Sequence, residues 1–394
     1  MRLESELGIG DQTGAIRLAY EGRLFPADQI HMFRNSERVF ASRVVRRGGE
    51  VQPLPRAPSS MPWSIEQGPL LDLRIRSREQ DYDIFDYISR NRVAGLLVLK
   101  SGRVCFEHYE FGNDASTRWM SMSMAKSISS ALVGVAIQDG LIGSIEDPIT
   151  KYLPELVGSG YDGVSIRHVL QMTSGVRWDD THTDPASERR KMLELQIAQQ
   201  PGAILRYIAS LPRIAEPGTV WNYSTGETHI VGALVRAATG RWVSDYLSEK
   251  IWSKCGMEAD ATWWLESPQG LEVAGSGVSA TLRDYARFGL FMMNGGMIDG
   301  RAVLAPGWEQ DSGAPREIGG TRINYGYMWW PVPAADGSLA DGAFSARGIF
   351  GQFIYINPRE QVIVAVISAR AKPKGADVIL DNDFFNAVTA ATRR

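Results

Sequence analysis

The chain has 394 residues, of which 44% are hydrophobic and 22% are charged, and its formal net charge is −3 at pH 7. These values are ordinary for a globular protein, and they give no electrostatic reason to expect nucleic acid or an anionic membrane as a partner. Two cysteines, Cys105 and Cys255, are too few for a disulfide framework. The first residues lack the apolar segment of a signal peptide, and the rest of the sequence contains no apolar run long enough to cross a bilayer. We therefore expect a cytoplasmic protein.

Residues 1–62 are polar and rich in arginine, and they end in a proline-rich run from Pro53 to Pro62. This composition predicts an extended N-terminal arm that lies over the surface of the remaining chain, residues 63–394.

Two pairs of apolar runs, far apart in the chain, predict β-hairpins. Residues 93–99 are followed by residues 104–109, and residues 353–357 by residues 362–367. Each hairpin alone would be marginally stable, so we expect both to join one antiparallel sheet.

Four further segments are predicted to be helices, and the first three end at a glycine, a common helix stop. These segments are residues 165–172, 229–238, 279–293 and 378–392. The fold class expected is α/β (α+β), with an antiparallel sheet flanked by helices. The sheet domain comprises residues 63–145 and 290–394, and an all-helical lobe is inserted at residues 146–289.

Ser123 and Lys126 form a Ser-x-x-Lys directly before an apolar run from Ile128 to Ile137. On a helix, these two side chains lie one turn apart on the same face. A serine becomes a nucleophile when a nearby base takes its proton, and a neutral amine is such a base. The surrounding apolar residues lower the pKa of the lysine by desolvation. The alternative is a serine cap with a surface lysine, which is what most matches to so short a motif are.

Tyr223 lies on a predicted tight turn within Trp221-Asn-Tyr-Ser-Thr-Gly-Glu227. A phenol close to Ser123 and Lys126 would relay a proton to a leaving group. Taken alone, an aromatic plug in the core is the better explanation of this tyrosine, and only the other motifs favour a catalytic role.

Gly348 stands in Ala346-Arg-Gly-Ile-Phe-Gly-Gln352, immediately before the strand predicted at residue 353. A glycine at an edge strand allows close approach of another backbone. An amide N–H in this segment and that of Ser123 would form an oxyanion hole. A glycine-rich bulge is the alternative.

Other motifs carry little weight. Gly158-Ser-Gly160-Tyr-Asp-Gly163 has the spacing of a dinucleotide loop but follows no strand, and the five histidines have no metal-ligand spacing. Gly-x-Ser-x-Gly is absent. We therefore expect neither a metal nor a cofactor, and Lys126 is the best candidate for the base.

Together and in this order, the three motifs resemble the serine β-lactamase and penicillin-recognising superfamily. The resemblance covers roughly residues 90–390 and is strongest to its class C-like branch, which includes DD-peptidases, family VIII carboxylesterases and 6-aminohexanoate-dimer hydrolase. Asp184–Glu188, Trp329-Trp330 and Gly348–Gln352 are most similar to the last of these.

The resemblance implies a β-lactamase/transpeptidase-like fold and a set of site residues. Ser123 would be the acylated nucleophile, Lys126 its proton acceptor and Tyr223 the donor to the leaving group. The backbone amides of Ser123 and Ile349 would bind the oxyanion. Substrate-binding residues would be Trp178, Trp330 and Gly348.

Two departures from the family pattern narrow the expected substrate. Ala346 has no charge where β-lactamases carry a lysine that meets the substrate carboxylate, and Arg347 is expected to point to the opposite face of the strand. In 6-aminohexanoate-dimer hydrolase a tyrosine assists amide cleavage, and Trp178 takes its place in this chain. An indole N–H donates a hydrogen bond but cannot accept a proton.

The expected function is therefore that of a serine hydrolase acting through an acyl-enzyme on small carboxylic esters and on short linear amides such as 6-aminohexanoate dimer. A β-lactamase or DD-peptidase is one alternative, and an inactive ligand-binding scaffold is another. A homodimer is left open.

Overall fold

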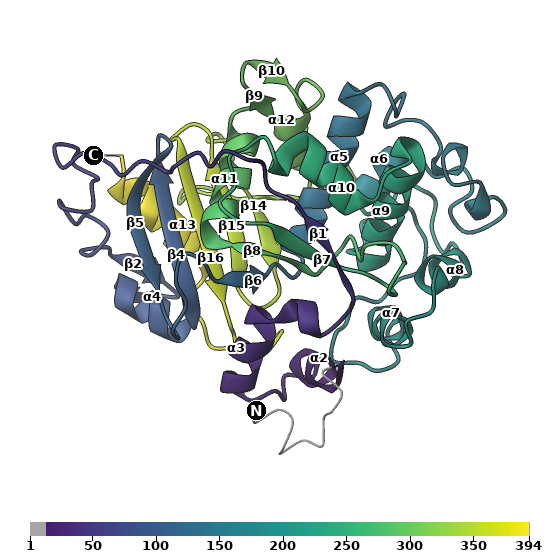
Figure 1. Ribbon diagram of the computed structural model, residues 1–394, viewed down its shortest axis with the longest axis horizontal. Helices are drawn as coiled ribbons and strands as arrows, with labels where there is room; N and C mark the ends of the chain where they lie inside the picture. Colours follow the sequence, from purple (N-terminus) through teal and green to yellow (C-terminus); the bar gives the residue numbers. More distant parts are fainter. Residues whose placement is uncertain (1–12, 394) are drawn as a thin grey trace.

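The computed structural model describes residues 13–393. A six-stranded antiparallel sheet, in the order β13-β14-β15-β16-β4-β5, stands beside a helical lobe (Figure 1). Its strands are β4 (Val93–Lys100), β5 (Arg103–Tyr109), β13 (Trp330–Pro331), β14 (Phe344–Gly348), β15 (Gln352–Asn357) and β16 (Val362–Ser368).

The predicted union of the two hairpins in one sheet is confirmed, because β16 pairs with β4 and places Val364 opposite Val98. Helices α4 (Ile84–Arg90) and α13 (Asp381–Ala391) cover one face of this sheet, and α11 (Leu282–Met293) packs on the other. Both faces are thus buried, which explains why these strands read as unbroken apolar runs instead of alternating ones.

A second sheet has the order β1-β7-β8-β6. Its strands are β1 (Ser42–Val45), β6 (Arg118–Met120), β7 (Ala261–Trp264) and β8 (Val278–Thr281). Strands β7 and β8 lie within residues 146–289, so this range, expected to be all helical, also contains two strands. Both are four-residue segments with every residue buried, and such short apolar runs do not distinguish strand from helix by periodicity.

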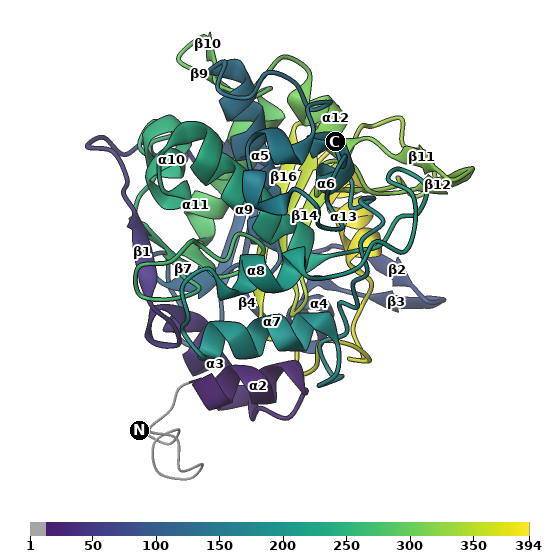
Figure 2. The same cartoon turned by 90° about the vertical axis from the view of Figure 1, so that its right-hand side faces the viewer.

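The helical lobe surrounds one long buried helix, α5, which packs against α9 (Figure 2). Its helices are α5 (Met124–Gln138), α6 (Ile166–Leu170), α7 (Glu188–Ile197), α8 (Ala203–Ala209), α9 (Thr225–Thr239) and α10 (Val243–Leu247), followed by a π-helical turn at Ser248–Trp252. The predicted stop after α9 is confirmed, because Gly240 caps that helix in the left-handed conformation (φ 68°).

The N-terminal segment differs from the extended arm expected at residues 1–62, of which residues 1–12 lie outside the described part. It contains α2 (Thr13–Tyr20), α3 (Pro26–Arg34) and a 3-10 turn (Ser36–Arg38) before β1. Ile16 and Phe33 are fully buried in the main core, and Phe33 contacts Phe350 at a ring-centroid distance of 5.4 Å. The segment is structured because it buries apolar side chains that its polar average composition conceals.

The remaining elements are short. They are β2 (Ile75–Ser77), β3 (Gln80–Tyr82), 3-10 turns at Ile149–Lys151 and Pro154–Leu156, β9 (Met297–Ile298), β10 (Arg301–Ala302), α12 (Trp308–Gly313), β11 (Arg316–Ile318) and β12 (Thr321–Ile323). Within residues 13–393, no helix has the length and apolar character that a membrane span requires.

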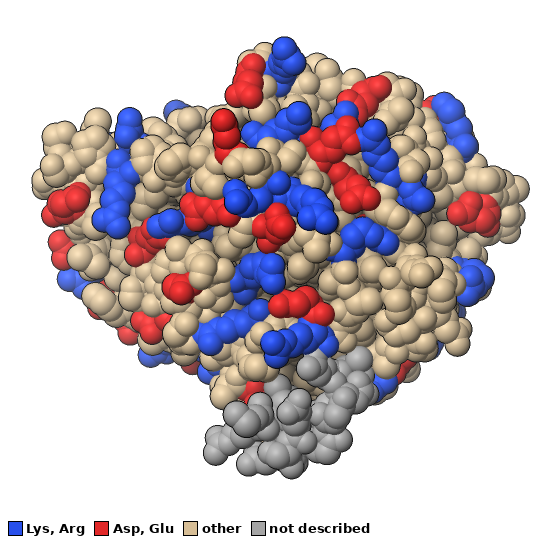
Figure 3. Space-filling model, viewed as in Figure 1, with Lys and Arg blue, Asp and Glu red and all other residues tan. Residues whose placement is uncertain are grey.

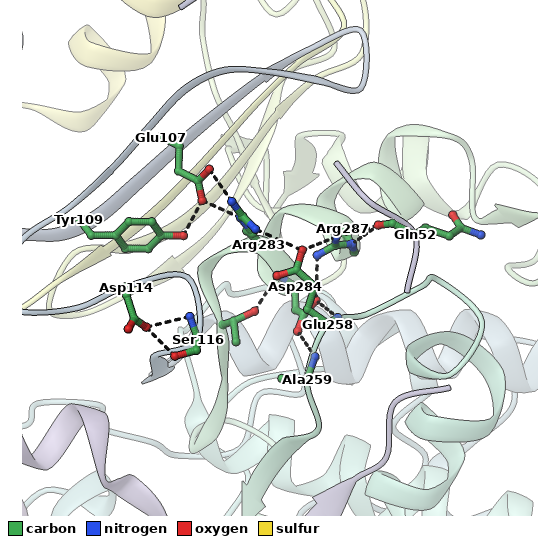
Figure 4. A network of polar contacts seen from close by, with 11 residues as sticks. Gln52, Glu107, Tyr109, Asp114, Ser116, Glu258, Ala259, Arg283, Asp284 and Arg287 are labelled. Atoms are coloured by element: carbon green, nitrogen blue, oxygen red, sulfur yellow. Dashed lines mark hydrogen bonds and ion pairs between the residues drawn. The ribbon is translucent and has the colours of Figure 1, made fainter. Parts of the chain in front are cut away.

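Ion pairs join α11 to β5 and to the segment that precedes β7 (Figure 4). Arg283 of α11 donates to Glu107 of β5 at 2.7 and 2.9 Å, while Arg287 donates to Glu258 and to the Gln52 carbonyl, each at 2.7 Å. On the face shown in Figure 3, charges of both signs are interspersed, without a continuous basic surface.

Candidate active site

The backbone before α5 places Ser123 at the N-terminal end of that helix. Met122 has a left-handed conformation (φ 46°), which is strained for a long side chain and is characteristic of functional sites. From Met124 to Ala136 every residue of α5 is buried. The helix is therefore a rigid core element that holds Ser123 at its electropositive end.

Lys126 lies one turn further along α5, and its Nζ donates to Ser123 Oγ at 2.9 Å and to the Gly275 carbonyl at 3.1 Å. The lysine is only 1% exposed. Desolvation lowers its pKa from 10.5 to about 7, although the carboxylate of Asp180 opposes this shift. A substantial fraction of Lys126 is therefore neutral near pH 7, the form that accepts a proton from serine.

Tyr223 lies on the turn that leads into α9, and its hydroxyl is hydrogen-bonded to Ser123. Burial raises its pKa, with a further contribution from the negative charge of Asp180. The phenol is therefore protonated and able to donate. Its ring is held by Trp330, at a centroid distance of 5.8 Å, and by Tyr325, at 6.0 Å.

Gly348 brings the end of β14 against the chain that enters α5. A Cβ at this position would lie 2.7 Å from the Ser121 carbonyl oxygen and 2.4 Å from Gln352 Oε1. The following turn is closed by a hydrogen bond from the Gly351 N–H to the Gly348 carbonyl (3.1 Å). Only glycine permits this approach of two backbones.

Two backbone amides beside this contact have no acceptor. Throughout residues 13–393, the N–H groups of Ser123 and Ile349 form no hydrogen bond within the chain. Backbone N–H groups are obligatory donors, and both residues line one cavity. Together they have the character of an oxyanion hole.

The cavity has a volume of about 530 Å3 and two walls. We call the wall from the helical lobe the lobe wall; it comprises Trp178, Asp179, Asp180, Thr181, His182, Trp221, Asn222 and Tyr223. The sheet wall comprises Trp330, Arg347, Gly348, Ile349 and Lys374, and Ser123 lies between the two walls. Every site residue expected from the sequence lines this cavity, apart from Lys126, which contacts it through Ser123.

Trp178 lines the cavity, but its indole N–H is already engaged within the protein. Its indole N–H donates to Asp180 Oδ1 at 2.7 Å. Its ring covers the start of α9, where a Cβ on Gly226 would lie 2.6 Å from the ring. The indole N–H is thus engaged within the protein, and Trp178 supports the wall without offering a hydrogen bond to substrate.

Arg347 lies on the opposite face of β14 from Ala346, as alternation along the strand predicts. Its guanidinium donates to Ser345 Oγ at 2.8 Å and to Asn382 Oδ1 at 3.0 Å. The residue nevertheless borders the cavity, a position that strand alternation alone did not predict.

Sequence reasoning missed Asp180. Its Oδ1 also accepts the Thr225 N–H at 3.0 Å, at the first turn of α9. Burial by itself raises the pKa of this carboxyl, but contacts with His182, Lys126 and Arg189 outweigh burial and lower it. Asp180 is therefore a carboxylate whose field acts on Lys126. No spacing in the sequence connects it with the Ser-x-x-Lys.

His182, Trp221, Asn222 and Lys374 were also missed. Desolvation lowers the pKa of His182 to about 3, so its imidazole is neutral. Asn222 Nδ2 donates to the Trp178 carbonyl at 2.8 Å and holds the lobe wall together.

Within residues 13–393, no cluster of three or more histidine, cysteine and acidic side chains has the arrangement of a metal site.

Comparison with known proteins supports the family expected from the motifs. A family model described as Beta-lactamase matches residues 85–384. The chain is 30% identical over 293 residues to 6-aminohexanoate-dimer hydrolase of Paenarthrobacter ureafaciens, covering 71% of this chain and 73% of that protein. It is 23% identical over 217 residues to a beta-lactamase of Yersinia enterocolitica, covering 49% of each.

Solved structures share the fold. A putative 6-aminohexanoate-dimer hydrolase from Bacillus anthracis superimposes with a TM-score of 0.78 at 22% identity, over 92% of this chain and 93% of that one. A family VIII carboxylesterase gives a TM-score of 0.58 at 18% identity, over 76% of this chain and 91% of that one. The fold class predicted from the sequence is confirmed.

Proposed function

The chain belongs to the beta-lactamase family of serine hydrolases, and within it we propose that the protein hydrolyses small carboxylic esters and, more slowly, short linear amides. The observation that carries this proposal is the 2.9 Å contact between Lys126 Nζ and Ser123 Oγ, made by a lysine that is 1% exposed. A nucleophile with its own buried base needs no histidine.

In the acylation step, neutral Lys126 takes the proton of Ser123, and Oγ attacks the substrate carbonyl carbon. The N–H groups of Ser123 and Ile349 stabilise the negative charge that develops on the carbonyl oxygen. Tyr223 protonates the leaving oxygen or nitrogen, and the ammonium of Lys126, whose Nζ lies 5.2 Å from the centroid of the Tyr223 ring, returns a proton to the phenolate. The acyl group is then bound to Oγ as an ester.

In the deacylation step, a water molecule attacks the acyl carbon. Tyr223 accepts a proton from this water as it passes its own phenolic proton to neutral Lys126, and the oxyanion forms between the same two amides. The Lys126 ammonium then returns a proton to Ser123 Oγ as the carboxylic acid departs. Each residue thus acts as acid in one half-reaction and base in the other.

Esters are the favoured substrates because their leaving group needs less help. An amine departs only after its nitrogen is protonated, and in this site Tyr223 is the proposed donor. The indole of Trp178 is engaged with Asp180 and supplies no second donor to the departing nitrogen.

A β-lactamase or DD-peptidase activity is the second candidate, favoured by the similarity to beta-lactamases. It is opposed by Ala346, which is fully buried and uncharged at the position where β-lactamases carry the lysine that meets the substrate carboxylate. Hydrolysis of nitrocefin at rates comparable with those of simple esters would support this candidate over ours.

The direct test is turnover of p-nitrophenyl butyrate by wild type and by Ser123→Ala. We expect the variant to lose activity by a factor of about 10³ or more, and a fluorophosphonate to label wild type but not the variant. Equal activity in both proteins would refute the nucleophile, whereas a wild type that is neither labelled nor active would indicate a ligand-binding scaffold.

A further inference from the structure

Lys374 lines the cavity that contains Ser123, although it comes from the segment between β16 and α13. Its side chain is exposed. Among the contacts of residues 13–393, none is a hydrogen bond or an ion pair of Lys374. An unpaired cation at the rim of a cavity of this size is available to a ligand.

The other cations near the cavity are already engaged. Lys126 is bound to Ser123 and to the Gly275 carbonyl. Arg347 is bound to Ser345 and Asn382. Arg347 keeps its charge but is held by two neutral acceptors, so among the described lining residues Lys374 is the cation without a hydrogen-bond partner.

The lobe wall has the opposite character, because it carries the acidic residues Asp179 and Asp180. Neighbouring positive charges, set against the effect of burial, keep the pKa of Asp180 below its usual value, so this carboxyl is ionised. An anionic group on a bound substrate is repelled from the lobe wall and attracted to Lys374. The two walls of the cavity therefore differ in charge.

We propose that Lys374 is a specificity-determining residue that binds an anionic group, a carboxylate in particular, on the ester or amide substrate. This inference rests on the proposed hydrolase function and adds a substrate class to it. The flexible four-carbon stem of a lysine lets its ammonium follow carboxylates on acyl chains of different length, and a charge-assisted hydrogen bond is stronger than a neutral one.

Two matched substrate pairs test the proposal. The monoester p-nitrophenyl hydrogen glutarate differs from p-nitrophenyl butyrate by one carboxylate on the acyl side. In the same way, 4-acetoxybenzoate differs from phenyl acetate on the leaving-group side. The quantity measured is the ratio of kcat/KM for the charged member to that for the neutral member, at low ionic strength.

We expect Lys374→Ala to lower this ratio roughly twofold to tenfold in at least one pair, Lys374→Glu to lower it further, and Lys374→Arg to retain most of it. The pair that responds tells which part of the substrate carries the anion. Lys372→Ala is the matched control, since Lys372 belongs to the same segment but lies against Gly22, and it should leave both ratios unchanged.

The proposal is overturned if the wild type hydrolyses the neutral esters and Lys374→Ala changes neither ratio, a result that leaves the proposed hydrolase function intact. It is also overturned if Lys372→Ala lowers the ratios as much as Lys374→Ala does, because general surface charge would then be the cause. A wild type that cleaves none of the four esters refutes the hydrolase function itself.

Discussion

Gly348 lies so close to Ser121 that a β-carbon on the glycine would be 2.7 Å from the serine carbonyl oxygen. This contact joins the end of β14 to the chain that leads into α5. It therefore fixes the distance between the two proposed oxyanion donors, the N–H of Ile349 on one segment and that of Ser123 on the other.

Replacement of Gly348 by alanine should therefore separate the amides of Ser123 and Ile349. We expect kcat for p-nitrophenyl butyrate to fall by about 10²–10³ with a smaller change in KM, because the oxyanion forms in the transition state. Gly49→Ala is the control: a Cβ there meets nothing within 4 Å, and its kinetics should match those of wild type. Normal kcat in Gly348→Ala would contradict the assignment of Ile349.

The pH dependence of acylation should report Lys126. Because desolvation lowers its pKa from 10.5 to about 7 and the neutral amine is the active form, kcat/KM should rise with pH and level off above about 7. Lys126→Arg, which stays protonated, should lose about 10³-fold or more. A rate that falls as pH increases through 7 would exclude the lysine as the base.

The buried Lys126 should also reduce the stability of the folded protein near pH 7. A lysine with a lowered pKa in the folded state binds fewer protons than in the unfolded state between pH 7 and 10.5, so the wild type loses stability as pH falls through that window. Lys126→Met removes the buried amine, and we expect the free energy of unfolding at pH 7 to increase by about 1–3 kcal/mol. Urea titration of both proteins at pH 7 and pH 10 measures the effect; a variant less stable than wild type at pH 7 would argue against it.

Asp180 should tune the base from a distance. Its negative charge raises the pKa of Lys126, so Asp180→Asn should shift the acidic limb of the kcat/KM profile to lower pH. The amide oxygen of asparagine still accepts the hydrogen bonds from Trp178 and Thr225, which preserves the wall. An unchanged limb, or one displaced to higher pH, would show that the carboxylate does not act on Lys126.

The loss of activity in Tyr223→Phe should depend on the leaving group of the substrate. For an anilide, which must be protonated to depart, we expect a loss of about 10²–10⁴ in kcat/KM. For p-nitrophenyl butyrate, whose phenolate departs unaided, the loss should be at least tenfold smaller. Equal losses for both substrates would indicate that the tyrosine positions Ser123 and does not donate a proton.

The buried carboxyl of Glu227 should make the stability of the protein depend on pH. Burial raises the pKa of this carboxyl from 4.5 to about 8, and its Oε2 has no partner among the described residues. The folded protein should therefore lose stability as pH increases from about 4.5 through 8. Glu227→Gln should reduce this loss, and the melting temperatures of both proteins from pH 5 to pH 9 would show whether the two curves converge at low pH.

The sequence by itself determined the two apolar hairpins and their union in one sheet, because continuous hydrophobic runs of strand length have few stable arrangements. It also supplied the order of Ser123, Lys126 and Tyr223, since Ser-x-x-Lys fixes a one-turn relationship within α5 that no distant contact has to provide.

Tertiary structure alone decided what surrounds that pair. Asp180 and Lys374 reach the cavity from segments far from α5 in sequence, and Trp178 donates to Asp180. The N-terminal helices are ordered because Ile16 and Phe33 find a core built by other parts of the chain. Local spacing specifies contacts within a helix, whereas the charge and shape of a cavity depend on which distant segments the fold brings together.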